Sequence, residues 1–155
     1  MALAIPVPAP EAAHAADLAQ SFWQRAAELG ALDEQQRLAA IERGWSSSWL
    51  AALRQHLHLK PVELEPLLAL SEATMARRTR EQVALDLVAS ERLDRLVEVI
   101  SMAYGVFEQP ASTEAWLKAP HPLLRQITPL QHCRTAIGAG QVRRLLQALE
   151  QGAPA

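Results

Sequence analysis

The side chains in this sequence most capable of chemistry are five histidines and one cysteine. The histidines are His14, His56, His58, His121 and His132. None of them forms the H-x-x-x-H pattern with a nearby carboxylate that is typical of a zinc site. Cys133 follows His132 directly, but adjacent residues on a helix face apart, so this histidine is poorly placed to act as its base. With no phosphate-binding glycine loop and no nucleophile elbow, the sequence predicts a binding protein without a cofactor, not an enzyme.

Three arginines form a second group, within four positions of one another. An arginine side chain can hold a phosphate or read guanine with two hydrogen bonds. Ser71 and Thr74, at the start of the same predicted helix, are short enough to reach a phosphate or a base edge. The sequence therefore predicts a DNA contact made by Ser71, Thr74, Arg77, Arg78 and Arg80.

The segments around these arginines have the spacing of a helix-turn-helix. Leu50, Leu53 and Leu57 form an apolar stripe, Pro61 is well placed to begin a short helix, and Ser71 can cap the next one. Ala69 and Leu70 form the tight turn between them. A helix-turn-helix inserts its second helix into the major groove, with that helix's first residues at the base edges.

Three residues oppose DNA binding by this helix. Ala69 stands in the turn, where a helix-turn-helix often has glycine. Glu72 stands at the helix start, where a phosphate would otherwise bind. Pro66 lies inside the preceding predicted helix, where it removes a hydrogen bond, so that helix should be short or kinked. The alternative is a solvated arginine face that pairs with Glu81 and Asp86.

Composition favours an all-α protein of one or two small domains. Half of the 155 residues are hydrophobic and the net charge is −2, so a core is possible and the chain is no polycation. Alanine and leucine, both good helix formers, are abundant. A single cysteine cannot form an intramolecular disulfide, no apolar run approaches a membrane span, and the N-terminus lacks a signal peptide. A cytoplasmic protein is expected.

The second half of the chain predicts several helices. Leu93, Leu96, Val97, Ile100, Tyr104 and Phe107 lie on one helix face. Ser112 can cap a short helix that the prolines at 120 and 122 end. Thr128 begins a capping box with Pro129 at the first helical position. Gly138 and Gly140 interrupt the chain before a last helix striped by Val142, Leu145, Leu146 and Leu149.

The predicted organisation has four parts. Residues 1–10 form a disordered tail, 11–44 an N-terminal helical arm, 45–92 the helix-turn-helix domain and 93–152 a small helical domain. In the arm, one helix covers residues 11–29, and Asp33 caps a second one anchored by Leu38 and Ile41. This arm is either a dimerisation element or a cover over the core. The predicted core comprises Leu53, Leu57, Leu67, Leu68, Leu93, Leu96, Ile100 and Phe107.

Residues from Gly44 to Gly152 resemble the MbcA/ParS/Xre antitoxin family. The resemblance rests on an ordered set of short motifs and not on one decisive signature. The set is Thr74, Arg77-Arg78, Ser90-Glu91-Arg92, Ala103, Val106-Phe107, Ala115-Trp116-Leu117, Pro120, Thr128-Pro129-Leu130, Thr135 and Gly138.

This resemblance implies an antitoxin of a bacterial type II toxin–antitoxin operon. The implied fold is an Xre-like helix-turn-helix domain followed by a toxin-binding domain. The implied partner is a RES-domain toxin, named for its Arg, Glu and Ser residues, that consumes NAD. Inhibition would come from covering the toxin's active-site cleft, and the helix-turn-helix would bind the operon's own operator, as a homodimer or within a larger complex.

On this interpretation, the toxin contacts come from the loop between Pro120 and Thr128 and from the last helix. Trp116 is expected to support the loop more than to touch the toxin. The predicted toxin-binding residues are Trp116, His121, Leu124, Arg125, Gln126, Arg143 and Arg144. The alternative function is a stand-alone transcription regulator of the same fold that has no toxin partner.

Overall fold

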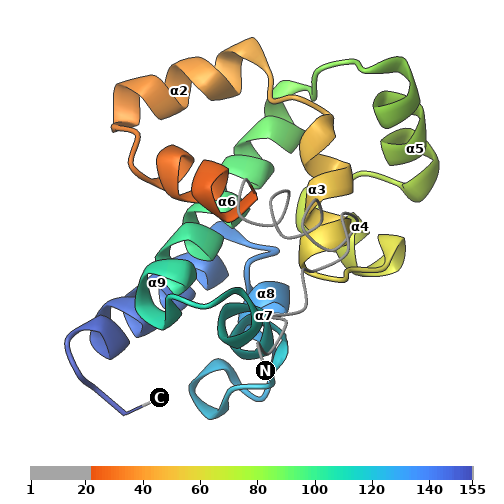
Figure 1. The fold of residues 1–155 in the computed structure, drawn as a ribbon. Helices are drawn as coiled ribbons and strands as arrows, with labels where there is room; N and C mark the ends of the chain where they lie inside the picture. The colour runs from red at the N-terminus through yellow and green to blue at the C-terminus, as the bar shows by residue number, and fades with distance from the viewer. Residues whose placement is uncertain (1–21, 155) are drawn as a thin grey trace, which may run out of the picture.

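The computed structural model describes residues 22–154 (Figure 1). In that range the chain forms helices and one isolated β-bridge, between His121 and Ile127. Residues 22–30 are helical. The elements that follow are α2 (Glu34–Arg43), α3 (Ser48–His56), α4 (Pro61–Leu68), α5 (Glu72–Glu81), α6 (Leu87–Phe107), α7 (Pro110–Lys118), the 3-10 helix η1 (Pro122–Leu124), α8 (Pro129–His132) and α9 (Ala136–Glu150). The all-α prediction is confirmed. The expected tail over 1–10, and the part of the expected first helix before residue 22, lie outside the described residues.

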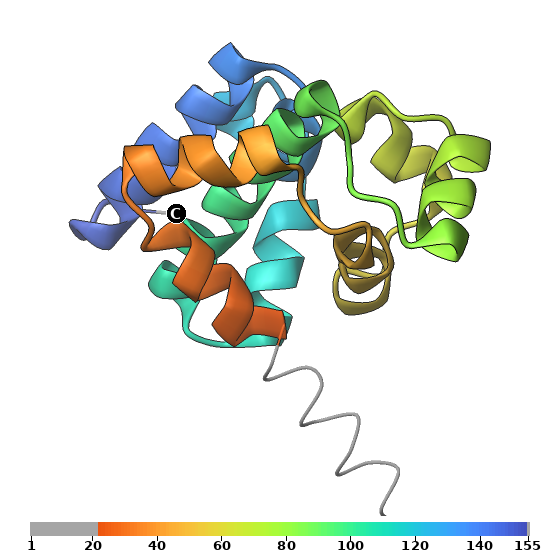
Figure 2. The same ribbon diagram turned by 90° about the horizontal axis from the view of Figure 1, so that it is seen from above.

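Helix α6 is the element on which the others assemble. It is 21 residues long, and α2, α4, α7 and α9 all pack against it. Leu93, Leu96 and Ile100 lie on its buried side, each at most 1 % exposed. In Figures 1 and 2, α5 and α9 lie at opposite ends of the molecule. Because α6 runs without a break through residues 92 and 93, the two predicted domains share this helix.

The helix-turn-helix consists of α4 and α5, with α3 preceding it. Pro61 occupies the first turn of α4, which ends at a left-handed Ala69. Pro66 lies inside α4, and the helix is only eight residues long, as its proline predicted. Ser71 caps α5 by accepting a hydrogen bond from the Thr74 amide. The predicted caps and turn are therefore those of the structure.

The predicted core is confirmed at seven positions and wrong at one. Phe107 is only half-buried, and its ring packs against Trp116 with the ring centroids 5.5 Å apart. Phe107 is the last residue of α6, so one side of it stays open to solvent. The buried predicted residues are Leu53, Leu57, Leu67, Leu68, Leu93, Leu96 and Ile100.

Helix α2 is attached mainly by charge. It buries no residue fully, and Leu38, expected to anchor it, is 50 % exposed. Arg37 instead reaches α6, where its guanidinium lies 2.6 Å from Asp94 and 3.0 Å from Glu98. Hydrogen bonds to Asp94, more than those to Glu98, raise the pKa of Arg37. The cover interpretation fits this placement, since α2 crosses α6 and packs against it (Figure 2).

Two helix starts differ from the prediction. Helix α7 begins at Pro110 after Gln109, and Ser112 lies within it instead of capping it. Helix α9 begins at Ala136, capped by Thr135, so Gly138 and Gly140 are helical residues and not breaks. Helix α9 therefore starts six residues earlier than the apolar stripe from Val142 suggested.

Candidate functional site

The start of α5 is a satisfied cap. The Ser71 hydroxyl accepts from the Thr74 amide at 3.1 Å and donates to the Thr74 hydroxyl at 2.9 Å. Ser71 is exposed and Thr74 half-buried, so both are near the surface with their hydroxyls already engaged. Each hydroxyl oxygen can still accept a further hydrogen bond, because it has two lone pairs and only one of them is used.

The three arginines of α5 do not act as one group. Arg77 and Arg80 are exposed on the side of the helix away from the buried Met75. Arg78 turns inward, where it donates to the Ala84 carbonyl at 3.0 Å and lies 3.8 Å from Asp86. Arg77 itself lies 3.7 Å from Glu81. Of the predicted DNA contacts, the structure leaves Arg77 and Arg80 available and uses Arg78 to hold the segment after α5.

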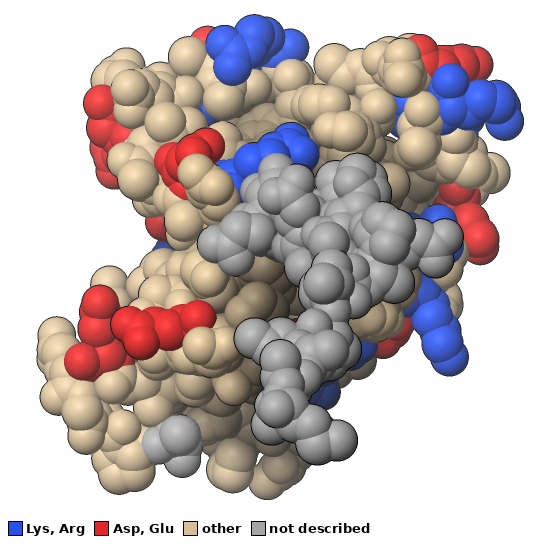
Figure 3. Space-filling view, in the orientation of Figure 1, with Lys and Arg blue, Asp and Glu red and all other residues tan. Residues whose placement is uncertain are grey.

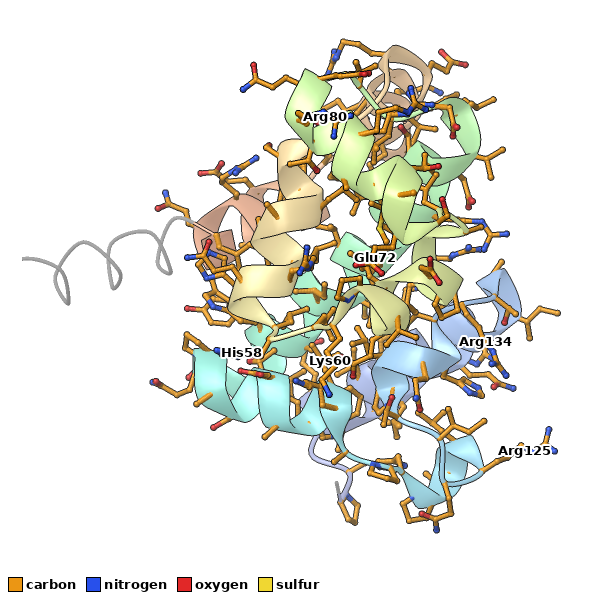
Figure 4. All side chains as sticks on the ribbon, turned by 90° about the vertical axis from the view of Figure 1, so that its right-hand side faces the viewer. His58, Lys60, Glu72, Arg80, Arg125 and Arg134 are labelled. Atoms are coloured by element: carbon orange, nitrogen blue, oxygen red, sulfur yellow. The ribbon has the colours of Figure 1, made fainter. Side chains whose placement is uncertain are left out.

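The amino end of α5 is already acidic. The Glu65 carboxylate accepts a 2.6 Å hydrogen bond from the Glu72 amide, and Glu72 follows in the first turn (Figure 4). Negative groups at this end complement the helix dipole, and they repel a phosphate that approaches the same place. Basic and acidic side chains are also mixed on the face of the molecule that Figure 3 draws.

The loop between α7 and α8 is closed by its own hydrogen bonds. The His121 amide donates to the Ile127 carbonyl at 3.2 Å, and the Gln126 amide donates to the His121 carbonyl at 3.0 Å. Arg125 and Gln126 both have left-handed backbones, with φ of 59° and 62°. This turn projects both side chains into solvent. Pre-ordered loops of this kind lose little entropy on binding.

Leu124 is wrong as a surface contact. Its side chain is 3 % exposed and belongs to the core, because η1 turns it inward. The neighbouring Leu123 takes the outer position and is 76 % exposed. Trp116 is half-buried, and its ring lies edge-on to His121 with the centroids 6.1 Å apart. Trp116 therefore contacts the loop it was expected to support.

The arginine pair of α9 is also divided. Arg143 is half-buried and donates to Glu98 at 3.2 Å, so it shares that carboxylate with Arg37. Arg144 is exposed. Arg143 thus joins α9 to α6. Arg144 is the exposed member of the pair, and no ion pair among residues 22–154 involves it.

A hollow of about 230 Å³ lies where the loop meets the start of α9. Ile137, on its rim, is 78 % exposed, and no ion pair among the described residues involves Arg125 or Arg134. The lining residues are Arg125, Ile127, Gln131, His132, Arg134, Thr135, Ile137, Gly138 and Gln141. Sequence reasoning missed Ile137, Arg134 and Gln141. Ile137 lies off the buried Ala139–Val142–Leu146 stripe, and that mismatch was the available signal.

Cys133 is not placed for nucleophilic chemistry. It is 2 % exposed, its thiol donates to the Pro129 carbonyl at 3.2 Å, and burial raises its pKa to about 12. The thiolate, which is the reactive form, is therefore scarce at neutral pH. Among residues 22–154, no His, Cys, Asp and Glu side chains gather in a group that could hold a metal ion. No helix in the same range is long and apolar enough to span a membrane.

Comparison with known proteins assigns both halves of the chain. Residues 36–98 match the antitoxin Xre-like helix-turn-helix domain, and residues 102–152 match the antitoxin Xre/MbcA/ParS C-terminal toxin-binding domain. "Antitoxin Xre" of Pseudomonas putida strain KT2440 is 30 % identical over 112 residues, which are 72 % of this chain and 69 % of that protein. The chain belongs to the Xre/MbcA/ParS antitoxin family.

A second relative supports the same assignment. The "Prs ADP-ribosylating antitoxin" of Sphingobium sp. strain YBL2 is 25 % identical over 126 residues, which are 76 % of this chain and 79 % of that protein. This chain is accordingly an antitoxin of a toxin–antitoxin system with a helix-turn-helix domain. The loop and the hollow beside α9 lie within the toxin-binding domain of this antitoxin.

Proposed function

We propose that this antitoxin inhibits a RES-domain, NAD-degrading toxin by covering its active-site cleft. The observation that carries the proposal is the surface between Leu123 and Ile137. Ile137, Arg125 and Arg134 line one hollow there, and the exposed Leu123 lies two residues before Arg125 in the same loop. All four residues belong to the domain matched as toxin-binding. Arginine forks pair well with carboxylates in a cleft, and aliphatic side chains gain by being buried there.

The contact set follows from exposure. Arg125, Gln126 and Arg144 stay in the proposed set, and His121 contributes from the half-buried base of the loop. Leu123 replaces Leu124, and Ile137 and Arg134 are added. Trp116 and Arg143 serve mainly to hold the loop and α9 in place. Steric blocking requires no catalytic residue in the antitoxin, which acts in the cytoplasm beside its toxin.

The helix-turn-helix is proposed to bind the operator of the same operon, as a homodimer or within the toxin complex. Arg77 and Arg80 are its phosphate and base contacts, and Ser71 and Thr74 can add uncharged ones. An ADP-ribosylating toxin is a second candidate partner, favoured by the name of the Sphingobium relative.

Co-expression with the product of the neighbouring gene tests the proposal. Cells that produce this product should stop growing, and the full-length antitoxin should restore growth. Ile137→Glu, which puts a charge at the centre of the proposed contact, should fail to protect at equal protein level. Full protection by this variant would exclude the proposed surface. A neighbouring product that is harmless and does not bind the antitoxin would overturn the proposed pairing with a toxin from the same operon.

A further inference from the structure

The hollow beside α9 continues onto the helix-turn-helix domain. Two further hollows, of about 200 and 260 Å³, adjoin it and share lining residues with it and with each other. One wall of both is α4, and the opposite wall comes from the toxin-binding domain. We call this the junction groove; its residues are Val62, Glu63, Pro66 and Leu67 of α4 with Lys118, Ile127, Thr128, Leu130, Gln131 and Arg134 across from them.

The α4 wall has properties that a folding role does not explain. Val62 is 67 % exposed, and Pro66 is exposed although it lies inside the helix. A proline there has no N–H for the Val62 carbonyl, so this acceptor loses its usual helical donor. Neither side chain contributes to the core. Together they present an aliphatic surface to whatever fills the junction groove.

We propose that the toxin fills the junction groove and so grips α4 of the helix-turn-helix domain as well as the toxin-binding domain. This inference rests on the proposed function, because it extends the same contact. Ile127, Gln131 and Arg134 line both the hollow beside α9 and the groove, so a protein seated on one meets the other directly.

The size of the contact favours this occupant. A stable protein–protein interface uses about 20–30 residues on each side. The hollow beside α9 offers far fewer than that, and the junction groove brings the footprint closer to the required size. Its charge is also suitable, because Arg134 makes no described ion pair and the Glu63 carboxylate is engaged by the Lys60 amide at 2.7 Å.

Three matched substitutions test the proposal. Val62, Val88 and Ile137 are exposed aliphatic residues, each at the second position of its helix. Glutamate is favourable in the first turn of a helix, so Val62→Glu, Val88→Glu and Ile137→Glu should all fold. Val62 lines the junction groove, Ile137 lines the hollow beside α9, and Val88 lines neither. Circular dichroism and thermal melts check that the full-length variants are folded.

Affinity for the purified toxin is then measured by calorimetry. Val62→Glu and Ile137→Glu should each weaken binding at least about tenfold, since each buries a charge where an aliphatic contact was. Val88→Glu should bind within about twofold of the parent. Light scattering on the free antitoxin gives its mass for each variant.

The outcomes separate the two proposals. Loss of binding in Ile137→Glu with parental binding in Val62→Glu would overturn the shared footprint and leave the proposed function intact. Parental binding in both would overturn the proposed toxin surface itself. A lower mass for free Val62→Glu alone would identify a second copy of this chain as the occupant and overturn the inference. An equal loss in Val88→Glu would do the same, because the effect would then not depend on the groove.

Discussion

Two glycines in helices should respond to the same substitution with opposite signs. Gly138 lies in the first turn of α9 and Gly105 near the end of α6. Alanine is the better helix former by about 1 kcal/mol, so propensity alone predicts that Gly→Ala stabilises both helices. Their surroundings differ. A Cβ at Gly105 would meet nothing within 4 Å, whereas one at Gly138 would overlap the His132 carbonyl oxygen.

The clash at Gly138 should outweigh the gain in propensity. The obstacle is backbone at the end of α8, which cannot rotate away, and the same Cβ would lie 2.9 Å from the Thr135 hydroxyl that caps α9. Overpacking of this kind costs roughly 1–3 kcal/mol, and rigid backbone places it near the upper end. After the gain of about 1 kcal/mol, Gly138→Ala should lose about 1–2 kcal/mol. Gly105→Ala should gain about 0.5–1 kcal/mol.

Chemical denaturation of both variants measures the two values. In thermal melts, each kcal/mol should correspond to about 2–4 °C for a chain of this size. Gly138→Ala should also weaken toxin binding, since Gly138 and His132 both line the hollow beside α9 and a shift of α8 would deform it. A Gly138→Ala protein as stable as Gly105→Ala would refute the reasoning that close contact, and not chain flexibility, requires glycine at this position.

Three other predictions concern charge. Arg37→Met should lower the free energy of unfolding by about 2 kcal/mol, because it leaves Asp94 and Glu98 without their shared partner. Partial exposure of these side chains keeps the loss below that of a fully buried ion pair. A loss under about 0.5 kcal/mol in urea denaturation would contradict this prediction. Burial, with a smaller effect of His58, lowers the pKa of His56 in the folded protein. The unfolded chain therefore binds a proton at His56 more readily than the folded chain does. Stability should accordingly fall as the pH drops from about 7 through 6.5 and below. His56→Phe should flatten this dependence and keep the stacking on Phe22, whose ring centroid lies 4.6 Å away; an unchanged pH profile would reject the assignment. Arg77→Ala with Arg80→Ala should reduce the slope of log affinity against log salt for operator DNA by about 1.8, whereas Arg78→Ala should mainly reduce stability; equal salt effects in a gel-shift series would show that all three arginines contact DNA.

Helix boundaries were predictable where one local signal acted alone. Asp33, Ser71 and Thr128 each cap the helix that the sequence assigned to them. At α7 two signals competed, and proline at the first helical position moved the start before Ser112. At α9 the glycines suggested a break, because the low helix propensity of glycine is visible in the sequence. The close approach of the His132 carbonyl to Gly138, which explains the glycine there, is visible only in the structure.

The candidate site was predictable as a region and less so as a set of side chains. The loop from Pro120 to Thr128 follows from its prolines, but which leucine faces outward depends on the turn of η1. The inward turn of Arg78 could have been read from its spacing, since it lies three residues after the buried Met75 and shares its face. The roles of Arg37 and Arg143 required the structure, because Glu98 joins three helices far apart in sequence.

The shared helix α6 has a consequence for how the two proposed activities relate. The helix-turn-helix and the toxin-binding domain both pack on α6, and Lys118 of α7 ties them again by donating to the Leu57 carbonyl at 2.9 Å. The first helix of a helix-turn-helix crosses the DNA backbone, and that helix here is α4. A toxin that fills the junction groove would occupy the same helix, and a rigid connection through α6 gives it no way to swing clear. We therefore expect operator DNA and toxin to compete for this antitoxin, which selects the free homodimer over the toxin complex as the form that binds the operator. Excess toxin should then release the operator in a gel-shift titration, and an operator that stays bound at saturating toxin would contradict the competition.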